Sequence, residues 1–171
     1  MYKISILLIV GFLMASCSSP NAATGPNVVV YIKYINKKGE NLLNPDRTHA
    51  ITEKNTNLYY LINGKKVKVY EGNLDNPKHF FIKYDSTDYY KDPSMWGYLM
   101  RVFPNTPDGQ DTATTYIVYK DYPTDTLKVQ YKRNNGIDVY VTKVWYNGEL
   151  RWEAGHHRRR VLTITKHRSG E

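Results

Sequence analysis

The stretch that decides the fold is LYYLINGKKVKVY, residues 58–70. Two runs rich in β-branched, aromatic and aliphatic residues flank the dipeptide Asn63-Gly64, which tolerates the positive φ angles of a type I′ turn. Runs joined by such a two-residue turn pair as an antiparallel hairpin. The stretch therefore predicts a hairpin of residues 58–62 with residues 65–70.

The turn also sets the register of this hairpin. A two-residue loop pairs Ile62 with Lys65, so Tyr60 faces Val67 and Leu58 faces Val69. Residues 59 and 61 then lie opposite lysines on the other side of the hairpin. The apolar pairs are expected on the buried side of a half-buried sheet.

The same turn recurs at Asn147-Gly148, between residues 143–146 and 149–152. Its register pairs Trp145 with Leu150 and Lys143 with Trp152. A looser turn at residues 134–136 predicts a further hairpin between residues 126–132 and 137–146. The face that these strands are expected to turn towards the core consists of Val139, Val141, Trp145, Leu150 and Trp152.

Five other segments have the composition and alternation of strands: residues 28–35, 80–84, 98–103, 115–120 and 161–165. Each is bounded by Gly, Pro, Asn or Asp, and no convincing amphipathic helix lies between them. Nine or ten short strands predict an all-β fold, an antiparallel β-sandwich that is immunoglobulin-like or similar, over residues 27–171. A closed barrel is the main alternative.

Residues 1–16 have the features of a secretory signal peptide. Lys3 precedes an apolar run over residues 4–14, which is shorter than the ~20 residues needed to cross a bilayer as a helix. Residues 14–16, Met-Ala-Ser, lead into Cys17, the single cysteine, and this resembles the bacterial lipobox. The resemblance implies cleavage before Cys17 and lipidation of its sulfur, whereas an ordinary signal peptide is the alternative. Residues 17–26 are predicted to form a flexible tether.

Four motifs resemble a pattern in small lipoproteins of Bacteroides and related Gram-negative bacteria. They are KKGENLLNPD at residues 37–46, YYLING at 59–64, DTLKV at 125–129 and WYNG at 145–148. The resemblance implies a β-sandwich at the cell envelope, and it brings no activity or site residues with it. The absence of acidic residues from 18–26 favours an outer-membrane anchor with the domain facing the periplasm.

The chain is basic, with a formal net charge of +8. An envelope address argues against nucleic acid as a partner. The densest basic run, residues 155–160, could bind phosphates or an acidic glycan, or it could be a charged loop that protects a sheet edge. Its candidate binding residues are His156, His157, Arg158, Arg159 and Arg160.

A second group of candidate binding residues lies in an aromatic segment, where rings on a loop could stack against sugars or peptides. These residues are Tyr89, Tyr90, Trp96 and Tyr98. The alternative is that the tyrosines cover the half-buried faces of strands.

No nucleophile motif and no metal-ligand spacing is present, so we predict no catalytic residues, no metal and no cofactor. The hypothesis that follows is a membrane-anchored envelope lipoprotein that acts as a non-enzymatic binding or interaction module for a glycan, a peptide or an envelope protein. A structural or assembly component of the envelope is the second hypothesis, and an envelope hydrolase is the third.

Overall fold

The computed structural model describes residues 28–86, 95–134, 138–155 and 160–170. Its described residues contain no α-helix and form ten strands. The strands are β1 (Val30–Ile35), β2 (Thr56–Ile62), β3 (Lys65–Lys68), β4 (Phe80–Asp85), β5 (Gly97–Val102), β6 (Thr112–Tyr119), β7 (Asp125–Asn134), β8 (Asp138–Tyr146), β9 (Glu149–Glu153) and β10 (Val161–Thr165).

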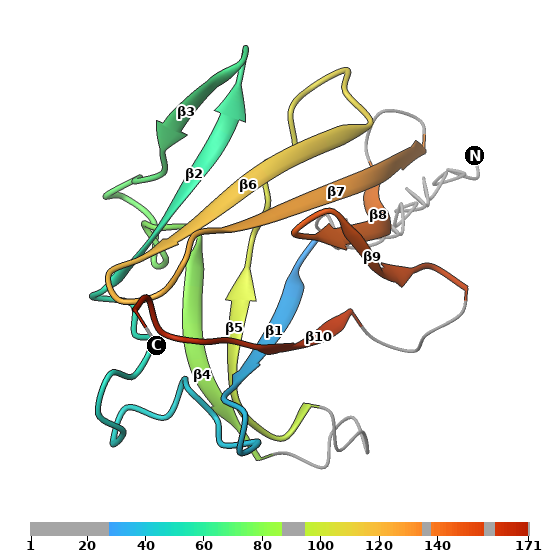
Figure 1. Ribbon diagram of the computed structural model, residues 1–171. Helices are drawn as coiled ribbons and strands as arrows, with labels where there is room; N and C mark the ends of the chain where they lie inside the picture. The colour runs from blue at the N-terminus through green and yellow to red at the C-terminus, as the bar shows by residue number, and fades with distance from the viewer. Residues whose placement is uncertain (1–27, 87–94, 135–137, 156–159, 171) are drawn as a thin grey trace, which may run out of the picture.

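Two sheets pack face to face, which confirms the predicted β-sandwich (Figure 1). One has four strands in the order β10-β1-β5-β4, and the other has six in the order β3-β2-β6-β7-β8-β9. All pairings within them are antiparallel except that of β1 with β10, which is parallel. The antiparallel prediction therefore holds for every neighbouring pair but this one.

The core lies between the sheets and follows the period of two along each strand. In β1 the residues Val30, Ile32 and Tyr34 are fully buried, while their neighbours are only partly so. Ile117 from β6 and Leu127 from β7 are equally buried in the six-stranded sheet. The sandwich thus buries one face of each sheet.

Both Asn-Gly turns form as predicted. Asn63 and Gly64 have φ angles of 49° and 76°, and Asn147 and Gly148 have 50° and 86°. The register of the first hairpin is also confirmed, since Tyr60 pairs with Val67 and Ile62 with Lys65.

The burial of this first hairpin differs from the expectation. Leu58 and Val69 are buried, but Ile62 is 41% exposed and Val67 is 45% exposed. Ile62 is exposed because β2 pairs with β6 only as far as Tyr60, opposite Thr115, and Val67 is exposed because it lies on β3, the edge strand. Beyond Tyr60 the hairpin extends past the end of the β2–β6 ladder.

The predicted register of the β8–β9 hairpin is right at Trp145–Leu150 and wrong at Lys143–Trp152. A bulge shifts the pairing, so Trp152 lies opposite Val144 instead. A second bulge interrupts the β7–β8 ladder after Gln130. Because a bulge reverses which side of the strand faces inward, Val144 is buried in the core.

The predicted core face of the β8–β9 region is right for three residues and wrong for two. Val141 and Trp152 are buried and Val139 packs against the core, as expected. Trp145 is only partly buried, with Lys128 Nζ lying 5.5 Å from its ring centroid, and Leu150 is exposed. For Trp145 and Leu150 the core prediction was wrong.

Candidate functional site

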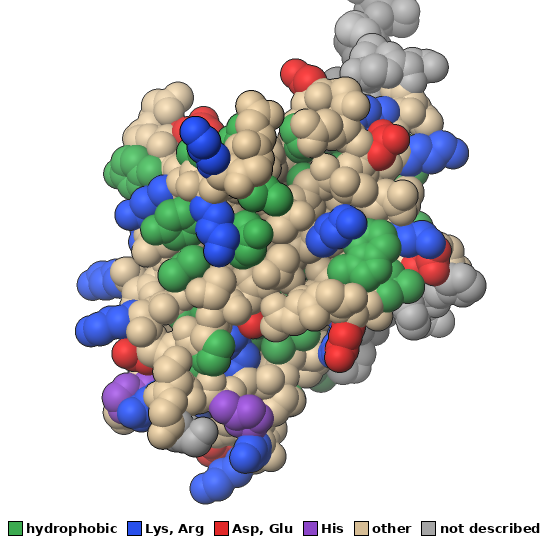
Figure 2. Space-filling model, turned by 45° about the horizontal axis from the view of Figure 1, so that its top comes forward, with side chains coloured by type: hydrophobic (Ala, Val, Ile, Leu, Met, Phe, Trp, Pro, Cys, Tyr) green, Lys and Arg blue, Asp and Glu red, His purple; other side chains and the backbone are tan. Residues whose placement is uncertain are grey.

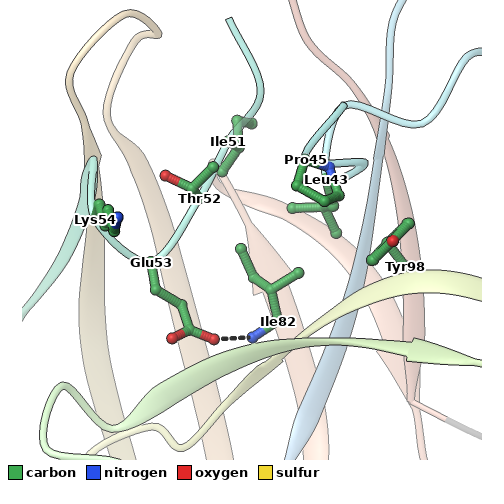
Figure 3. A pocket seen from close by; sticks show the side chains of 8 residues that line it. All are labelled: Leu43, Pro45, Ile51, Thr52, Glu53, Lys54, Ile82 and Tyr98. Atoms are coloured by element: carbon green, nitrogen blue, oxygen red, sulfur yellow. Dashed lines mark hydrogen bonds between the residues drawn. The ribbon is translucent and has the colours of Figure 1, made fainter. Parts of the chain in front are cut away.

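A pocket of about 380 Å³ opens beside β4, the edge strand of the four-stranded sheet (Figure 3). Aliphatic and aromatic groups dominate its walls, and the charged side chains come from residues 53 and 54. The residues that line it are Leu43, Pro45, Ile51, Thr52, Glu53, Lys54, Ile82 and Tyr98. It is therefore an apolar depression with two charges in its wall.

The segment from residue 41 to residue 55 forms one side of the pocket and is hydrogen-bonded to β5 of the four-stranded sheet. Asn41 Nδ2 donates to the carbonyl oxygen of Tyr98 at 2.9 Å, and Asn41 Oδ1 accepts from the backbone N–H of Leu43 at 2.8 Å. The backbone N–H of Ile51 donates to Leu42 O at 2.8 Å. Since Leu43 and Ile51 are almost fully buried, this wall is set in place by the fold.

Glu53 joins this segment to the edge of β4. Its Oε1 accepts a hydrogen bond of 2.8 Å from the backbone N–H of Ile82, the dashed line in Figure 3. Lys78 Nζ holds the same loop by donating to the carbonyl oxygens of Glu53 (2.6 Å) and Thr56 (3.0 Å). The Glu53 side chain thus accepts from a backbone N–H at the sheet edge that could otherwise pair with another strand.

A second pocket, of about 250 Å³, shares Glu53 and Lys54 with the first and is lined from β4 by Phe80. Phe80 and Ile82 are two residues apart, so their side chains lie on the same side of the strand. The two pockets therefore follow β4 at the spacing of alternate residues.

An aromatic pair adjoins the first pocket. The rings of Tyr98 and Tyr84 meet edge to face, with centroids 5.1 Å apart. Tyr84 is 55% exposed and Trp96, two residues before Tyr98, is 46% exposed. Of the aromatic candidates, Tyr98 lines the pocket and Trp96 is available at the surface, while Tyr89 and Tyr90 lie outside the described residues.

The basic candidates do not share this site. Arg160 precedes β10 and lies at the other end of the four-stranded sheet, where its carbonyl accepts from the N–H of Tyr31. Its guanidinium lies 5.4 Å from the ring centroid of Trp152, and burial lowers the pKa of Arg160 below its ordinary value. His156, His157, Arg158, Arg159 and Cys17 lie outside the described residues.

A buried polar network between the sheets was missed by the sequence analysis. Tyr146 and Lys166 donate to the Asp125 carboxylate, with both side chains of the Lys166–Asp125 pair about 5% exposed. Tyr119 donates to Tyr34, and Tyr34 in turn contacts the hydroxyl of Tyr146 at 3.1 Å. Because the Tyr146 hydroxyl proton goes to Asp125, Tyr34 donates in that contact.

This network consists of donors and acceptors that satisfy one another. Lys166 Nζ also donates to Pro123 O at 3.0 Å, and Asn147 Nδ2 donates to Asp125 Oδ1 at 2.9 Å. Burial lowers the pKa of Lys166 and raises those of the three tyrosines. The arrangement ties the residues after β10 to β7, and it does not line the pocket.

Within the described ranges, no three His, Cys, Asp or Glu side chains come together in a group that could hold a metal ion. The same part of the chain contains no helix long and apolar enough to cross a membrane. No family model, curated protein or solved structure matches the sequence or the fold.

Proposed function

We propose that the chain is a lipid-anchored lipoprotein of a Gram-negative cell envelope, and that its β-sandwich is a non-enzymatic binding module for an extended peptide segment of an envelope protein. Cys17 would carry the lipid, and the outer membrane would hold the anchor with the domain facing the periplasm. The lipobox resemblance supports the anchor. The pocket supports the binding role.

The observation that carries the binding role is the pair of pockets along β4. An extended peptide places alternate side chains on one side, at the same period as Phe80 and Ile82. Because Glu53 already accepts from the Ile82 N–H at the edge of β4, the pockets would hold such a peptide mainly by its side chains. The first pocket is mainly apolar, whereas the second has Asp75, Asn76 and Lys78 in its wall beside Phe80. The pair therefore favours a ligand with an apolar side chain at one position and a side chain with polar atoms two positions away.

A glycan is the second candidate ligand, and the exposed rings of Tyr84 and Trp96 favour it. Sugars stack on such rings, and the Tyr98–Tyr84 pair extends the wall of the first pocket with a further aromatic surface. A glycan would depend on Tyr84 and Trp96, whereas a peptide would depend on the two pockets.

Crosslinking followed by pull-down from the cell envelope tests the proposal. Thr52→Trp adds bulk at a residue that lines the first pocket and keeps the backbone N–H that donates to Asn55 Oδ1. We expect the native lipidated protein to capture a defined envelope peptide or protein and Thr52→Trp to lose it. The matched control is Thr124→Trp, at an exposed loop position that is not among the residues lining the pocket, and it should retain the captured partner.

Equal capture by both variants would contradict a pocket-based binding role. The anchor has a separate test, the mass of the mature N-terminus. A chain that starts at lipidated Cys17 is expected, and an unmodified cysteine there would contradict the anchor.

A further inference from the structure

The tip of the β2–β3 hairpin, residues 61–68, lies at the edge of the six-stranded sheet, and its turn extends beyond the end of the β2–β6 ladder. The β2–β6 ladder ends at Tyr60 and Thr115, but β2 continues to pair with β3 through Leu61–Lys66 and Ile62–Lys65. In Figure 1 this tip is the uppermost point of the ribbon. The end of β2 therefore has a strand neighbour on one side only.

The tip carries apolar side chains that the fold does not cover. Leu61, Ile62 and Val67 are all exposed, and the turn that joins their strands is polar. Charged side chains are sufficient to protect a free strand edge from pairing with other chains, and the lysines of β3 would serve that purpose. Three exposed aliphatic residues at one protruding tip instead indicate a partner with an apolar interior.

The same tip is strongly basic. Lys65, Lys66 and Lys68 are exposed, and residues 58–70 contain no carboxylate. Lys66 Nζ lies 3.9 Å from the ring centroid of Tyr116, on the outer face of the six-stranded sheet. Figure 2 shows basic and hydrophobic side chains next to each other on this side of the molecule. The partner must therefore present negative charge around its apolar interior.

We propose that the hairpin tip lies against the anionic phospholipid headgroups of the membrane that anchors the chain. A bilayer surface offers acyl chains to Leu61, Ile62 and Val67, and it offers negative charge to the lysines. This inference rests on the proposed lipid anchor at Cys17.

The position of the first described strand is compatible with a membrane at the hairpin tip. β1 begins in the upper half of the molecule in Figure 1, the half that also holds the hairpin tip. The step from Cys17 to Val28 spans at most about 40 Å when fully extended, so an anchored chain keeps Val28 within that distance of the bilayer and allows the tip to reach it. The 41–55 segment that walls the pocket lies at the lower end, facing away from the membrane.

Fluorescence from a labelled hairpin tests the proposal in the lipidated full-length protein, reconstituted in vesicles. The probe is an environment-sensitive dye on Ile62→Cys, and the matched control is the same dye on Thr48→Cys, which is exposed on the 41–55 segment. In phosphatidylglycerol vesicles we expect a blue shift and several-fold protection from iodide for the Ile62→Cys probe only. Phosphatidylcholine vesicles should give neither change.

Substituting the lysines measures how much they contribute to the binding of the hairpin to the anionic membrane. Each lysine near an anionic surface is worth about a factor of five, so Lys65→Gln, Lys66→Gln and Lys68→Gln together should reduce the ratio of bound to free hairpin about 100-fold. Equal spectra for the two probes in phosphatidylglycerol vesicles would overturn the proposal. So would a shift of the Ile62→Cys probe by a soluble acidic polysaccharide or by a second copy of the chain without vesicles.

The mass of the mature N-terminus separates failure of this inference from failure of the proposed function. A lipidated Cys17 with an unshifted hairpin probe refutes the membrane contact alone. An unmodified Cys17 refutes the anchor.

Discussion

Raising the pH above 10 is expected to unfold the domain through its buried tyrosines. Burial raises the pKa of five of them well above the ordinary value of 10.0: Tyr34, Tyr60, Tyr119, Tyr131 and Tyr146. Below pH 10 these groups are protonated in both the folded and the unfolded chain, so they do not affect the pH dependence. Above pH 10 only the unfolded chain loses their protons, and stability falls as the pH rises.

The magnitude follows from the number of groups. At one pH unit above the unfolded pKa, each protonated tyrosine costs about 1.4 kcal/mol of stability. Five of them cost about 7 kcal/mol at pH 11, comparable to the ~5–15 kcal/mol that stabilises a whole domain. Lys166 acts in the opposite direction at lower pH, because its pKa is lowered by burial and stability rises as the pH approaches 10.5. Unfolding is thus expected close to pH 11.

The assay combines tyrosinate absorbance with near-ultraviolet circular dichroism during a pH titration. The five tyrosines with raised pKa values should ionise together with unfolding. Tyr131→Phe should reduce the slope of stability against pH above pH 10 by one proton. Ionisation of these five tyrosines near pH 10 with intact near-ultraviolet dichroism would refute the reasoning.

Three further predictions concern the free energy of unfolding or the edge of the sheet. Lys166→Met leaves the Asp125 carboxylate buried without its cation and should cost about 3–5 kcal/mol in urea unfolding; the double variant with Asp125→Leu should cost less than the sum of the two single changes, and strict additivity would contradict direct coupling. Leu58→Ala should cost about 2–5 kcal/mol, but Ile62→Ala only about 0.5 kcal/mol, and equal costs would contradict the protruding hairpin. Glu53→Ala frees the edge N–H of β4 and should increase self-association in analytical ultracentrifugation, whereas Glu53→Gln retains an acceptor and should not.

Local signals were sufficient to predict the strands and the turns. An Asn-Gly dipeptide between β-prone runs determines both a turn and a register, so Tyr60–Val67 could be paired from the sequence. Such signals extend over a few residues, so they can be recognised within a single strand or hairpin. The parallel pairing of β1 with β10 depends on residues more than a hundred positions apart, and no local pattern encodes it.

Bulges explain the errors at Trp145 and Leu150. A single extra residue in β8 or β9 reverses which side chains face inward, and the sequence around Val144 contains no glycine that would mark it. Alternation alone therefore assigned the wrong face from that point onwards.

The candidate site was only partly accessible to sequence reasoning. Tyr98 and Trp96 were selected as aromatic residues beside a loop, but Glu53 and Ile82 come together only through the fold. One signal could have located the buried network. Leu162 and Ile164 alternate towards the core, and Lys166 continues the same series with a charged residue.

The most direct test of the binding role is a photo-crosslinking amino acid placed at Thr52 in the lipidated protein, in its native envelope. If the β4 pockets hold a ligand, irradiation should yield one defined adduct, and the same group at Thr124 should not yield it. Proteolysis and mass spectrometry should then identify an extended peptide with an apolar residue at the position that enters the first pocket. The absence of an adduct specific to Thr52 would contradict the proposed binding module.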